Sequence, residues 1–341
     1  IAGVTDLLLS LSEKLHIPVA TTLMGTGSVP ASYPLYTGLL GMHGTRVSNK
    51  VVSECDLLIN IGARFSDRVI SDMKRFAPNA RIMHIDADPA EINKNISVQF
   101  ALTGSTDLIL QEILDRTTPV DETEWAIAVK NWKEEYRLQF PENGTLRPSY
   151  IIQKFNELTG SDAIITTEVG QNQIWAAQFY EYIRPRQYVS SGGLGTMGYG
   201  TGAAIGAQMA RPDKRVINFA GDGSFRMNCN ELATAVHYEL PVIIAVLNNG
   251  TLGMVRQWQT MFYEKRYSQT TLDRGPDFVK LAEAYGAVGI RVKTPQEVGR
   301  AIEKALACKD VPVVIDFVID IDERVLPIVP PGKGIDQLIY A

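Results

Sequence analysis

The chain has 341 residues, of which 45% are hydrophobic and 21% are charged, and its formal net charge is −5. This composition is typical of a globular protein with enough apolar residues for two domains, and an acidic chain without a long basic run is poorly suited to phosphate-directed nucleic-acid binding. Three widely spaced cysteines exclude a disulfide framework and favour a cytoplasmic setting, and no apolar run approaches the roughly 20 residues of a membrane span.

The first 117 residues alternate helical and strand-like patterns. Leu7, Leu11 and Leu15 share one face of a predicted helix. We expect strands at residues 17–20, 57–62, 81–86 and 100–102, and a helix over residues 107–116 after the last of them. Strands separated by helical segments are typical of a parallel sheet.

Residues 118–147 are interpreted as a linker, because they contain two prolines and a turn-forming Glu-Asn-Gly run at 142–144. Within them, the charged segment 124–136 predicts one surface helix.

The remaining residues, 148–341, repeat the α/β plan as a second domain. We expect strands at residues 163–167, 187–190, 216–220, 242–247 and 313–319, and helices at residues 150–158, 228–238, 277–284 and 295–308. The predicted fold class is α/β, with two doubly wound parallel-sheet domains at residues 1–117 and 148–341.

Three loops of the second domain leave predicted strand ends with unusual chemistry. They are residues 168–173, 191–200 and 221–224. Ligands of open α/β sheets bind beyond the carboxyl ends of the strands. Glycine lets backbone N–H groups approach an anion, and the N-terminus of a following helix favours negative charge. One glycine-rich loop alone often serves only a tight turn, but three in one domain indicate an anion site.

Asp222 and Asn249 each follow an apolar, strand-like run. Their spacing can place one carboxylate and one amide oxygen at the ends of two neighbouring parallel strands. Such a pair suits a Mg²⁺ ion that is also coordinated by a phosphate ligand. The alternatives are two ordinary turns, since Asp-Gly and Asn-Gly are common turn sequences, or a helix N-cap role for Asp222.

The Gly-Asp-Gly run at 221–223, followed by Asn-Asn at 248–249, matches the thiamine diphosphate motif. The wider sequence resembles the large catalytic subunit of the acetohydroxyacid synthase (acetolactate synthase) family. The segments that carry this resemblance are residues 40–44, 62–69, 175–180, 191–200, 253–259 and 262–268. The resemblance implies a central FAD-binding domain and a C-terminal domain that binds thiamine diphosphate.

By this resemblance, Asp222 and Asn249 ligate Mg²⁺ with side-chain oxygens, and Thr251 does so with its backbone carbonyl. Met197 is the apolar residue that holds the cofactor bent, and the alternative is an ordinary core methionine. The other residues that the resemblance assigns to thiamine diphosphate are Gly170, Gln171, Asn172, Gly195, Gly221, Gly223 and Ser224.

The implied reaction is decarboxylation of pyruvate and ligation to a second 2-ketoacid, which gives 2-acetolactate or 2-aceto-2-hydroxybutyrate in branched-chain amino-acid biosynthesis. The second substrate needs a cation for its carboxylate, and Arg68 suits that role because guanidinium binds carboxylates bidentately. Met254 and Trp258 suit its alkyl group. A surface ion pair for Arg68 and a packing role for Trp258 are the alternatives.

The resemblance also implies a flavin site in the first domain. Asp86 ends a predicted strand, where a carboxylate can accept hydrogen bonds from ribose hydroxyls. His43 is equally well explained as a hydrogen-bonded loop histidine. The residues implied for FAD are Thr21, Thr22, Leu23, Met42, His43, Gly44, Gly62, Arg64, Val69 and Asp86.

The chain departs from the family pattern at several positions: Asn172 stands where the family usually has His, and Thr201-Gly202 where it has Leu-Pro. In the family, an N-terminal domain supplies the glutamate that activates the cofactor, and no glutamate here is assigned that role. We therefore interpret the chain as a fragment, and expect it to lack synthase activity by itself.

The resemblance further implies a homo-oligomer and a regulatory small subunit, with no nucleic-acid or membrane partner. Two alternatives remain at this point. One is another thiamine-diphosphate enzyme, such as pyruvate oxidase or glyoxylate carboligase. The other is a non-catalytic nucleotide-binding or scaffold protein built from these domains.

Overall fold

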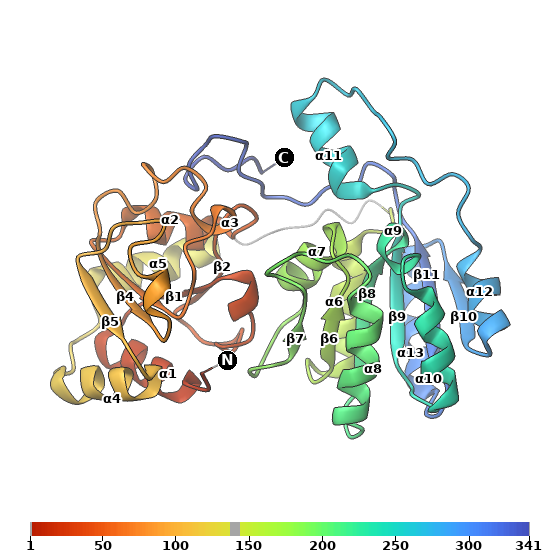
Figure 1. Ribbon diagram of the computed structural model, residues 1–341, viewed down its shortest axis with the longest axis horizontal. Helices are drawn as coiled ribbons and strands as arrows, with labels where there is room; N and C mark the ends of the chain where they lie inside the picture. Colours follow the sequence, from red (N-terminus) through yellow and green to blue (C-terminus); the bar gives the residue numbers. More distant parts are fainter. Residues whose placement is uncertain (1, 137–143, 341) are drawn as a thin grey trace. The chain divides into compact units, whose positions relative to one another are not determined.

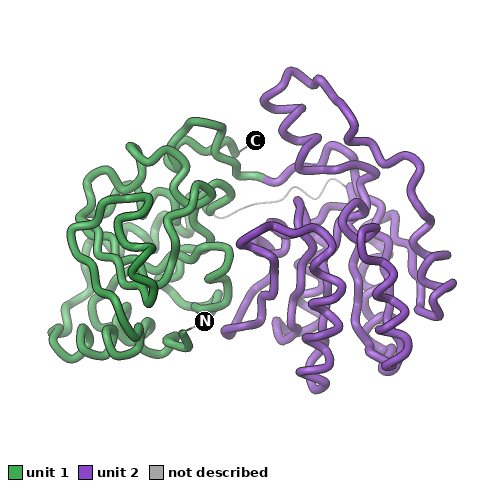
Figure 2. The backbone as a smooth tube through the Cα atoms, viewed as in Figure 1, with its two compact units in different colours: residues 1–139, 326–341 green, residues 140–325 purple. Residues whose placement is uncertain are grey.

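The computed structural model describes residues 2–136 and 144–340. These residues form two compact units, shown in different colours in Figure 2. Unit 1 comprises residues 1–139 together with residues 326–341, and unit 2 comprises residues 140–325. The C-terminal segment therefore belongs to unit 1, whereas the sequence had suggested an uninterrupted domain at 148–341. Residues 137–143 of the predicted linker, with most of its 142–144 turn, lie outside the described residues.

Unit 1 contains five short parallel strands in two sheets. The strands β1 (Val19–Thr21) and β2 (Tyr36–Leu39) pair with each other, and β3 (Leu57–Ile61), β4 (Arg81–Asp86) and β5 (Phe100–Thr103) form a sheet in that order. The helices are α1 (Thr5–Leu15), α2 (Arg46–Glu54), α3 (Asp67–Ile70), α4 (Thr106–Arg116) and α5 (Glu124–Glu135), with 3₁₀ turns η1 (Leu23–Gly25) and η2 (Pro89–Glu91).

Apolar faces place these helices. Leu7, Leu11 and Leu15 of α1 join a cluster with Ile85 of β4 and Leu110 of α4, as the helical spacing predicts. The helix α5 is not a free surface helix, because its Val129 is buried against Val47 and Val51 of α2. Packing of α5 against α2 therefore assigns residues 124–135 to unit 1.

Unit 2 is built on one six-stranded, wholly parallel sheet with the order β10-β11-β9-β8-β6-β7. Its strands are β6 (Ile164–Thr167), β7 (Tyr188–Val189), β8 (Val216–Gly221), β9 (Ile243–Asn248), β10 (Val288–Val292) and β11 (Val313–Val318). The helices are α6 (Pro148–Thr159), α7 (Gln171–Phe179), α8 (Gly200–Ala210), α9 (Asp222–Phe225), α10 (Leu232–His237), α11 (Gly253–Phe262), α12 (Phe278–Tyr285) and α13 (Pro295–Ala307), with the 3₁₀ turn η3 (Cys229–Glu231).

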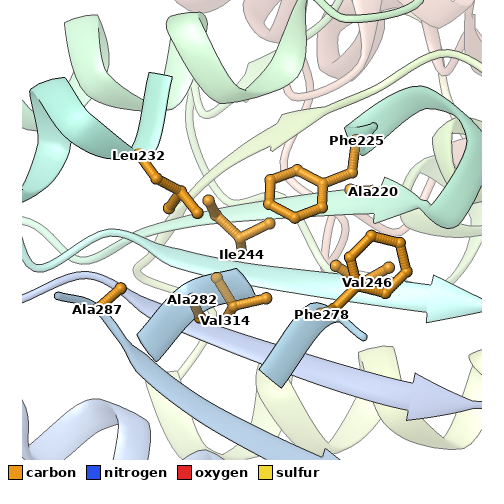
Figure 3. Close-up of a cluster of buried hydrophobic side chains, with 9 residues drawn as sticks. All are labelled: Ala220, Phe225, Leu232, Ile244, Val246, Phe278, Ala282, Ala287 and Val314. Carbon is orange, nitrogen blue, oxygen red and sulfur yellow. The ribbon is translucent and has the colours of Figure 1, made fainter. Parts of the chain in front are cut away.

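Helices cover both faces of this sheet (Figure 1). Phe219 of β8 packs edge-on against Phe155 of α6, with ring centroids 5.4 Å apart. The next residue, Ala220, points to the opposite face, as pleating requires. There it joins a buried cluster that Figure 3 shows, with Leu232 of α10 and Phe278 of α12. Apolar layers on both faces confirm the predicted α/β class with a doubly wound parallel sheet.

The strand order contains a topological switch point between β6 and β8. After β6 the chain runs through α7 to the edge strand β7, whereas after β8 it runs to β9 on the other side. The loops that leave β6 and β8 therefore diverge and open a crevice at the carboxyl ends of these strands, where ligands of this architecture bind. None of the helices in the described residues has the length and apolar character that a bilayer crossing requires.

Candidate functional site

A pocket lies at this switch point in unit 2. Its walls come from the loops and helix starts after β6, β7, β8 and β9. The lining residues are Val169, Gly170, Gln171, Asn172, Trp175, Met197, Gly221, Asp222, Gly223, Ser224, Leu247, Asn249, Thr251, Leu252, Gly253, Met254 and Val255.

The loop after β6 presents the start of α7 to the pocket. Gly170 precedes the helix with a φ of 147°, a conformation that favours glycine. The side-chain amide of Asn172 donates to the carbonyls of Glu168, at 3.0 Å, and Phe219, at 2.9 Å, which joins the ends of β6 and β8. The nitrogen of that amide is therefore committed to the protein, and the donors left for an anion here are backbone N–H groups at the N-terminus of α7.

Asp222 is the first residue of α9 and is 4% exposed. The N-cap of this helix is Gly221, so the alternative of an N-cap role for Asp222 does not hold. Burial raises the pKa of the Asp222 carboxyl to about 6, against partial compensation from backbone N–H groups that include those of Asn249 and Gly223. Among the described residues, no lysine or arginine forms an ion pair with Asp222. Burying a carboxylate without an ion pair costs free energy, and a bound cation would offset that cost.

Asn249 follows β9 and is 8% exposed. Its amide nitrogen donates to Gln171 Oε1 at 3.2 Å, and its oxygen accepts from the Thr251 N–H at 3.2 Å. The Thr251 hydroxyl donates to the Thr270 carbonyl at 2.8 Å, so this side chain is already engaged. Within residues 2–136 and 144–340, no backbone N–H is bonded to the Thr251 carbonyl. The structure thus brings Asp222, Asn249 and Thr251 together around one pocket.

The donor set fits a hard divalent cation that brings ligands of its own. In the described part of the chain, no group of three or more His, Cys, Asp or Glu side chains could hold a metal. One carboxylate, one amide oxygen and one carbonyl are oxygen donors, but they are too few to complete an octahedron around Mg²⁺. Such an ion would need phosphate or water oxygens as well.

Ser224 and Gly223 lie beside Asp222 in the pocket wall. The Ser224 hydroxyl is hydrogen bonded to the Gly221 backbone, accepting from its N–H at 3.3 Å and donating to its carbonyl at 3.1 Å. A Cβ on Gly223 would stand 2.8 Å from Leu252 Cδ2, so glycine keeps this wall close to the next loop.

The glycine-rich loop at 191–200 contributes Met197 to the pocket, whereas its Gly195 is exposed and does not line it. On α11, Met254 lines the pocket. Trp258 lies one turn further along the same face and packs edge-on against Phe262, with ring centroids 5.2 Å apart.

Sequence reasoning assigned no role to several lining residues, and Trp175 and Gly253 are the clearest examples. Trp175 is buried in α7 and donates its indole N–H to the Arg324 carbonyl at 3.2 Å. A Cβ on Gly253 would stand 1.9 Å from Gln171 Oε1, so only glycine fits at the start of α11. The position of Gly253, four residues after Asn249, is the one sequence signal that could have marked it.

The residues predicted for FAD all lie in unit 1, at or beyond the carboxyl ends of β1 to β4. Asp86 ends β4 and is 8% exposed, and its Oδ1 accepts from the Asp88 N–H at 2.9 Å. Gly62 follows β3 with a φ of 60° and nothing within 4 Å of a Cβ added there. The others are Thr21, Thr22 and Leu23 after β1, Met42, His43 and Gly44 after β2, Arg64 after β3, and Val69 in α3.

Two residues of unit 1 have contacts that bear on their predicted roles. His43 Nδ1 lies 3.1 Å from the Pro327 carbonyl, and burial is the largest cause that lowers its pKa, to about 4. It is therefore a neutral, hydrogen-bonded loop histidine. Arg68 is mostly exposed; its Nε lies 4.0 Å from Asp67 Oδ2, and its Nη1 lies 3.9 Å from Met42 Sδ. An exposed ion pair of this kind holds the guanidinium only weakly, so the guanidinium can still bind another carboxylate.

Comparison with protein families gives two matches that together span most of the chain. Residues 1–113 match the family described as "Thiamine pyrophosphate enzyme, central domain". Residues 168–317 match "Thiamine pyrophosphate enzyme, C-terminal TPP binding domain".

Curated relatives agree with these matches. The chain is 42% identical, over 100% of its length and 60% of the relative's, to a "Probable acetolactate synthase large subunit" of Methanococcus aeolicus. It is 45% identical to an "Acetolactate synthase large subunit" of Corynebacterium glutamicum, over 97% of this chain and 55% of that one. The corresponding protein of Haemophilus influenzae is 38% identical, over 100% of this chain and 61% of its own. The chain thus spans somewhat more than half the length of these relatives.

Proposed function

The chain belongs to the thiamine pyrophosphate enzymes, and from this premise we propose that its protein catalyses the acetolactate synthase reaction. In that reaction pyruvate loses CO₂ and its remaining two-carbon unit is joined to a second 2-ketoacid. Pyruvate as the second ketoacid gives 2-acetolactate, and 2-ketobutyrate gives 2-aceto-2-hydroxybutyrate. The observation that carries the proposal is the buried, unpaired Asp222 carboxylate beside Asn249 at the switch point.

Residues of unit 2 would hold Mg²⁺ and thiamine diphosphate. Asp222, Asn249 and the Thr251 carbonyl would ligate the metal ion, and its remaining ligands would be diphosphate and water oxygens. Backbone N–H groups at the starts of α7 and α9 would bind the diphosphate, since both helices begin at the pocket wall. When bound, thiamine diphosphate supplies the electron sink for decarboxylation.

The apolar wall of the pocket suits the alkyl part of a small ketoacid. Met197 and Met254 line it with flexible, polarizable side chains, and Trp258 extends the same face of α11. Arg68 of unit 1 would bind the carboxylate of the second ketoacid, a role for which its guanidinium is suited.

The complete gene product is expected to form 2-acetolactate from pyruvate when Mg²⁺, thiamine diphosphate and FAD are supplied. The product is measured directly, with the Asp222→Ala variant as the inactive reference. Consumption of pyruvate without 2-acetolactate would contradict the synthase assignment and favour another enzyme of the family. Failure to bind thiamine diphosphate at all would instead favour a scaffold.

Unit 1 is proposed to bind FAD. The support is that the predicted residues lie at the carboxyl ends of parallel strands, where dinucleotides bind in α/β folds, and that Asp86 places a carboxylate there. Gly62, at the end of the neighbouring strand β3, has nothing within 4 Å of a Cβ added there.

Replacing Asp86 with alanine is expected to weaken FAD binding about 10-fold or more, because hydrogen bonds to a charged group are worth roughly 1.5–3 kcal/mol. The measurement is a titration followed by the visible absorbance of bound flavin. Asp56→Ala is the matched control, since Asp56 is exposed at the opposite end of the same sheet, just before β3. Equal affinities of the two variants would rule out a role for Asp86.

The names of the relatives describe large subunits of acetolactate synthases. We propose by analogy that this protein assembles into an oligomer and has a regulatory small subunit as a partner. Co-purification of a smaller chain with the complete protein, followed by its identification, tests this assignment.

A further inference from the structure

Glu168 is fully buried, although no role has been assigned to it. It follows the last residue of β6 and reaches the start of α8. Its Oε2 accepts from the Gly198 N–H at 2.7 Å, and its Oε1 accepts from the Thr201 N–H at 3.1 Å and the Thr201 hydroxyl at 3.3 Å. Both oxygens of the Glu168 carboxylate thus accept hydrogen bonds from the glycine-rich loop and the start of α8.

The charge of Glu168 is balanced by backbone dipoles. Among the described residues, no lysine, arginine or histidine forms an ion pair with it. Burial raises its pKa, and the N–H groups of Gly200, Thr201 and Gly198 counter that rise. A carboxylate at the N-terminus of α8 is also stabilised by the helix dipole. These partners hold the carboxylate in one position.

Gly198 is held from its other side by Asn228. The Asn228 amide nitrogen donates to the Gly198 carbonyl at 2.6 Å. Gly198 has a φ of 84°, and a Cβ there would stand 3.1 Å from that nitrogen, so a side chain would disturb both the backbone and the contact. Elsewhere the loop is open to solvent, with Leu194 at its tip 95% exposed.

Met197 is the residue next to Gly198, and it is the part of this loop that lines the pocket. Its Cε lies 4.0 Å from the point where a Cβ on Gly223 would stand. We propose that Glu168 and Asn228 are positioning residues, which hold the N–H and the C=O of Gly198 and thereby fix Met197 against the pocket. We call this arrangement the Gly198 clamp. Its consequence for turnover rests on the proposed function.

Glu168→Gln tests the clamp, because glutamine has one acceptor oxygen and would leave either Gly198 or Thr201 facing an NH₂ group. Hydrogen exchange of peptides that cover residues 191–203 is expected to be about 10-fold faster at whichever of the Gly198 and Thr201 amides faces the NH₂ group, since a charge-assisted hydrogen bond is lost there. Glu181→Gln is the control, because Glu181 is exposed in the same unit. Unchanged exchange in a folded Glu168→Gln protein would overturn the proposal.

Asn228→Ala provides a second variant if Glu168→Gln does not fold. Asn228 is only half-buried, and its replacement removes the donor to the Gly198 carbonyl while leaving the buried carboxylate in place. The same loop peptides are expected to lose protection in this variant. Exchange rates equal to those of the wild type would count against the clamp.

A second experiment measures turnover by the complete gene product. Glu168→Gln is expected to lower kcat for 2-acetolactate about 10-fold while KM for pyruvate changes less than about 3-fold. Because Glu168 is proposed to act through Met197, adding Glu168→Gln to Met197→Ala should cause little further loss. If the two substitutions together lower kcat by the product of their separate effects, Glu168 does not act through Met197. If the wild type forms no 2-acetolactate, the proposed function fails, and the exchange experiment still decides whether the clamp exists.

Discussion

Asp222→Ala is expected to abolish Mg²⁺-dependent binding of thiamine diphosphate. The variant removes the single carboxylate of the proposed metal site, which is buried and forms no ion pair with a lysine or arginine among the described residues. Loss of residues that merely support a metal ligand commonly costs about 10–100-fold in affinity, so loss of the charged ligand itself should cost at least about 100-fold. Calorimetric titration with thiamine diphosphate, with and without Mg²⁺, measures it.

The stability of the same variant separates a binding role from a structural one. Burial of the Asp222 carboxylate is unfavourable without a metal ion, so the metal-free alanine variant is expected to be at least as stable as the wild type. A helix cap would show the opposite, with a loss of roughly 1 kcal/mol. Asp310→Ala is the control, because Asp310 is exposed just before β11, at the end of the sheet opposite to the site. Undiminished Mg²⁺-dependent binding by Asp222→Ala would refute the assignment.

Gly253→Ala is expected to weaken binding of Mg²⁺ and thiamine diphosphate by about 10–100-fold, through displacement of Asn249, a proposed metal ligand. A Cβ at this position would stand 1.9 Å from Gln171 Oε1 and 2.6 Å from Asn249 Nδ2. Gln171 cannot easily move away, because its amide nitrogen donates to Gln257 Oε1 and to the Glu323 carbonyl, each at 2.9 Å. The added methyl group is therefore expected to displace the Asn249 side chain.

Overpacking of this kind also lowers the free energy of unfolding, by roughly 1–3 kcal/mol. Gly299→Ala is the matched control, since Gly299 lies within α13 and nothing stands within 4 Å of a Cβ there. That variant should gain roughly 0.5–1 kcal/mol, because alanine favours the helical backbone. Thermal unfolding and calorimetric titration of both variants are the measurements. A Gly253→Ala protein that binds like Gly299→Ala would show that the site tolerates the methyl group.

Much of the fold follows from the sequence where strands are buried on both faces. The run that predicts β9 is apolar from Val242 to Leu247, and those that predict β8 and β11 are interrupted by one polar residue each, Asn218 and Asp316. The structure places all three strands in the middle of the sheet. The short strand β2 and the edge strand β10 were not predicted. Each is interrupted by a glycine, at Gly38 and Gly289, and β10 also carries the charged Arg291. Both runs are short and contain a glycine, a residue that is depleted in strands, so local pattern fails there.

The residues of the candidate site also differ in how well the sequence predicts them. Asp222 and Asn249 could be paired from sequence, because each stands at the end of a recognisable strand and parallel strands end at one edge. The contact of Glu168 with Gly198 could not, since these residues are far apart in the chain and the contact depends on how one loop folds back. For Gly253 the sequence offers only its position four residues after Asn249, because the need for glycine there arises from Gln171, which approaches from another loop.

The return of residues 326–341 to unit 1 has a consequence for how the chain is made. The Ile335 carbonyl accepts from the Asn49 side-chain amide at 3.0 Å, and the Val329 N–H donates to the Met42 carbonyl at 2.9 Å. Unit 1 is therefore assembled from two stretches of chain, with all of unit 2 inserted between them. During synthesis, which proceeds from the N-terminus, unit 2 has its whole sequence available first. The loop that carries Met42 and the helix α2 that carries Asn49 acquire these two partners only after residues 329 and 335 have been synthesised.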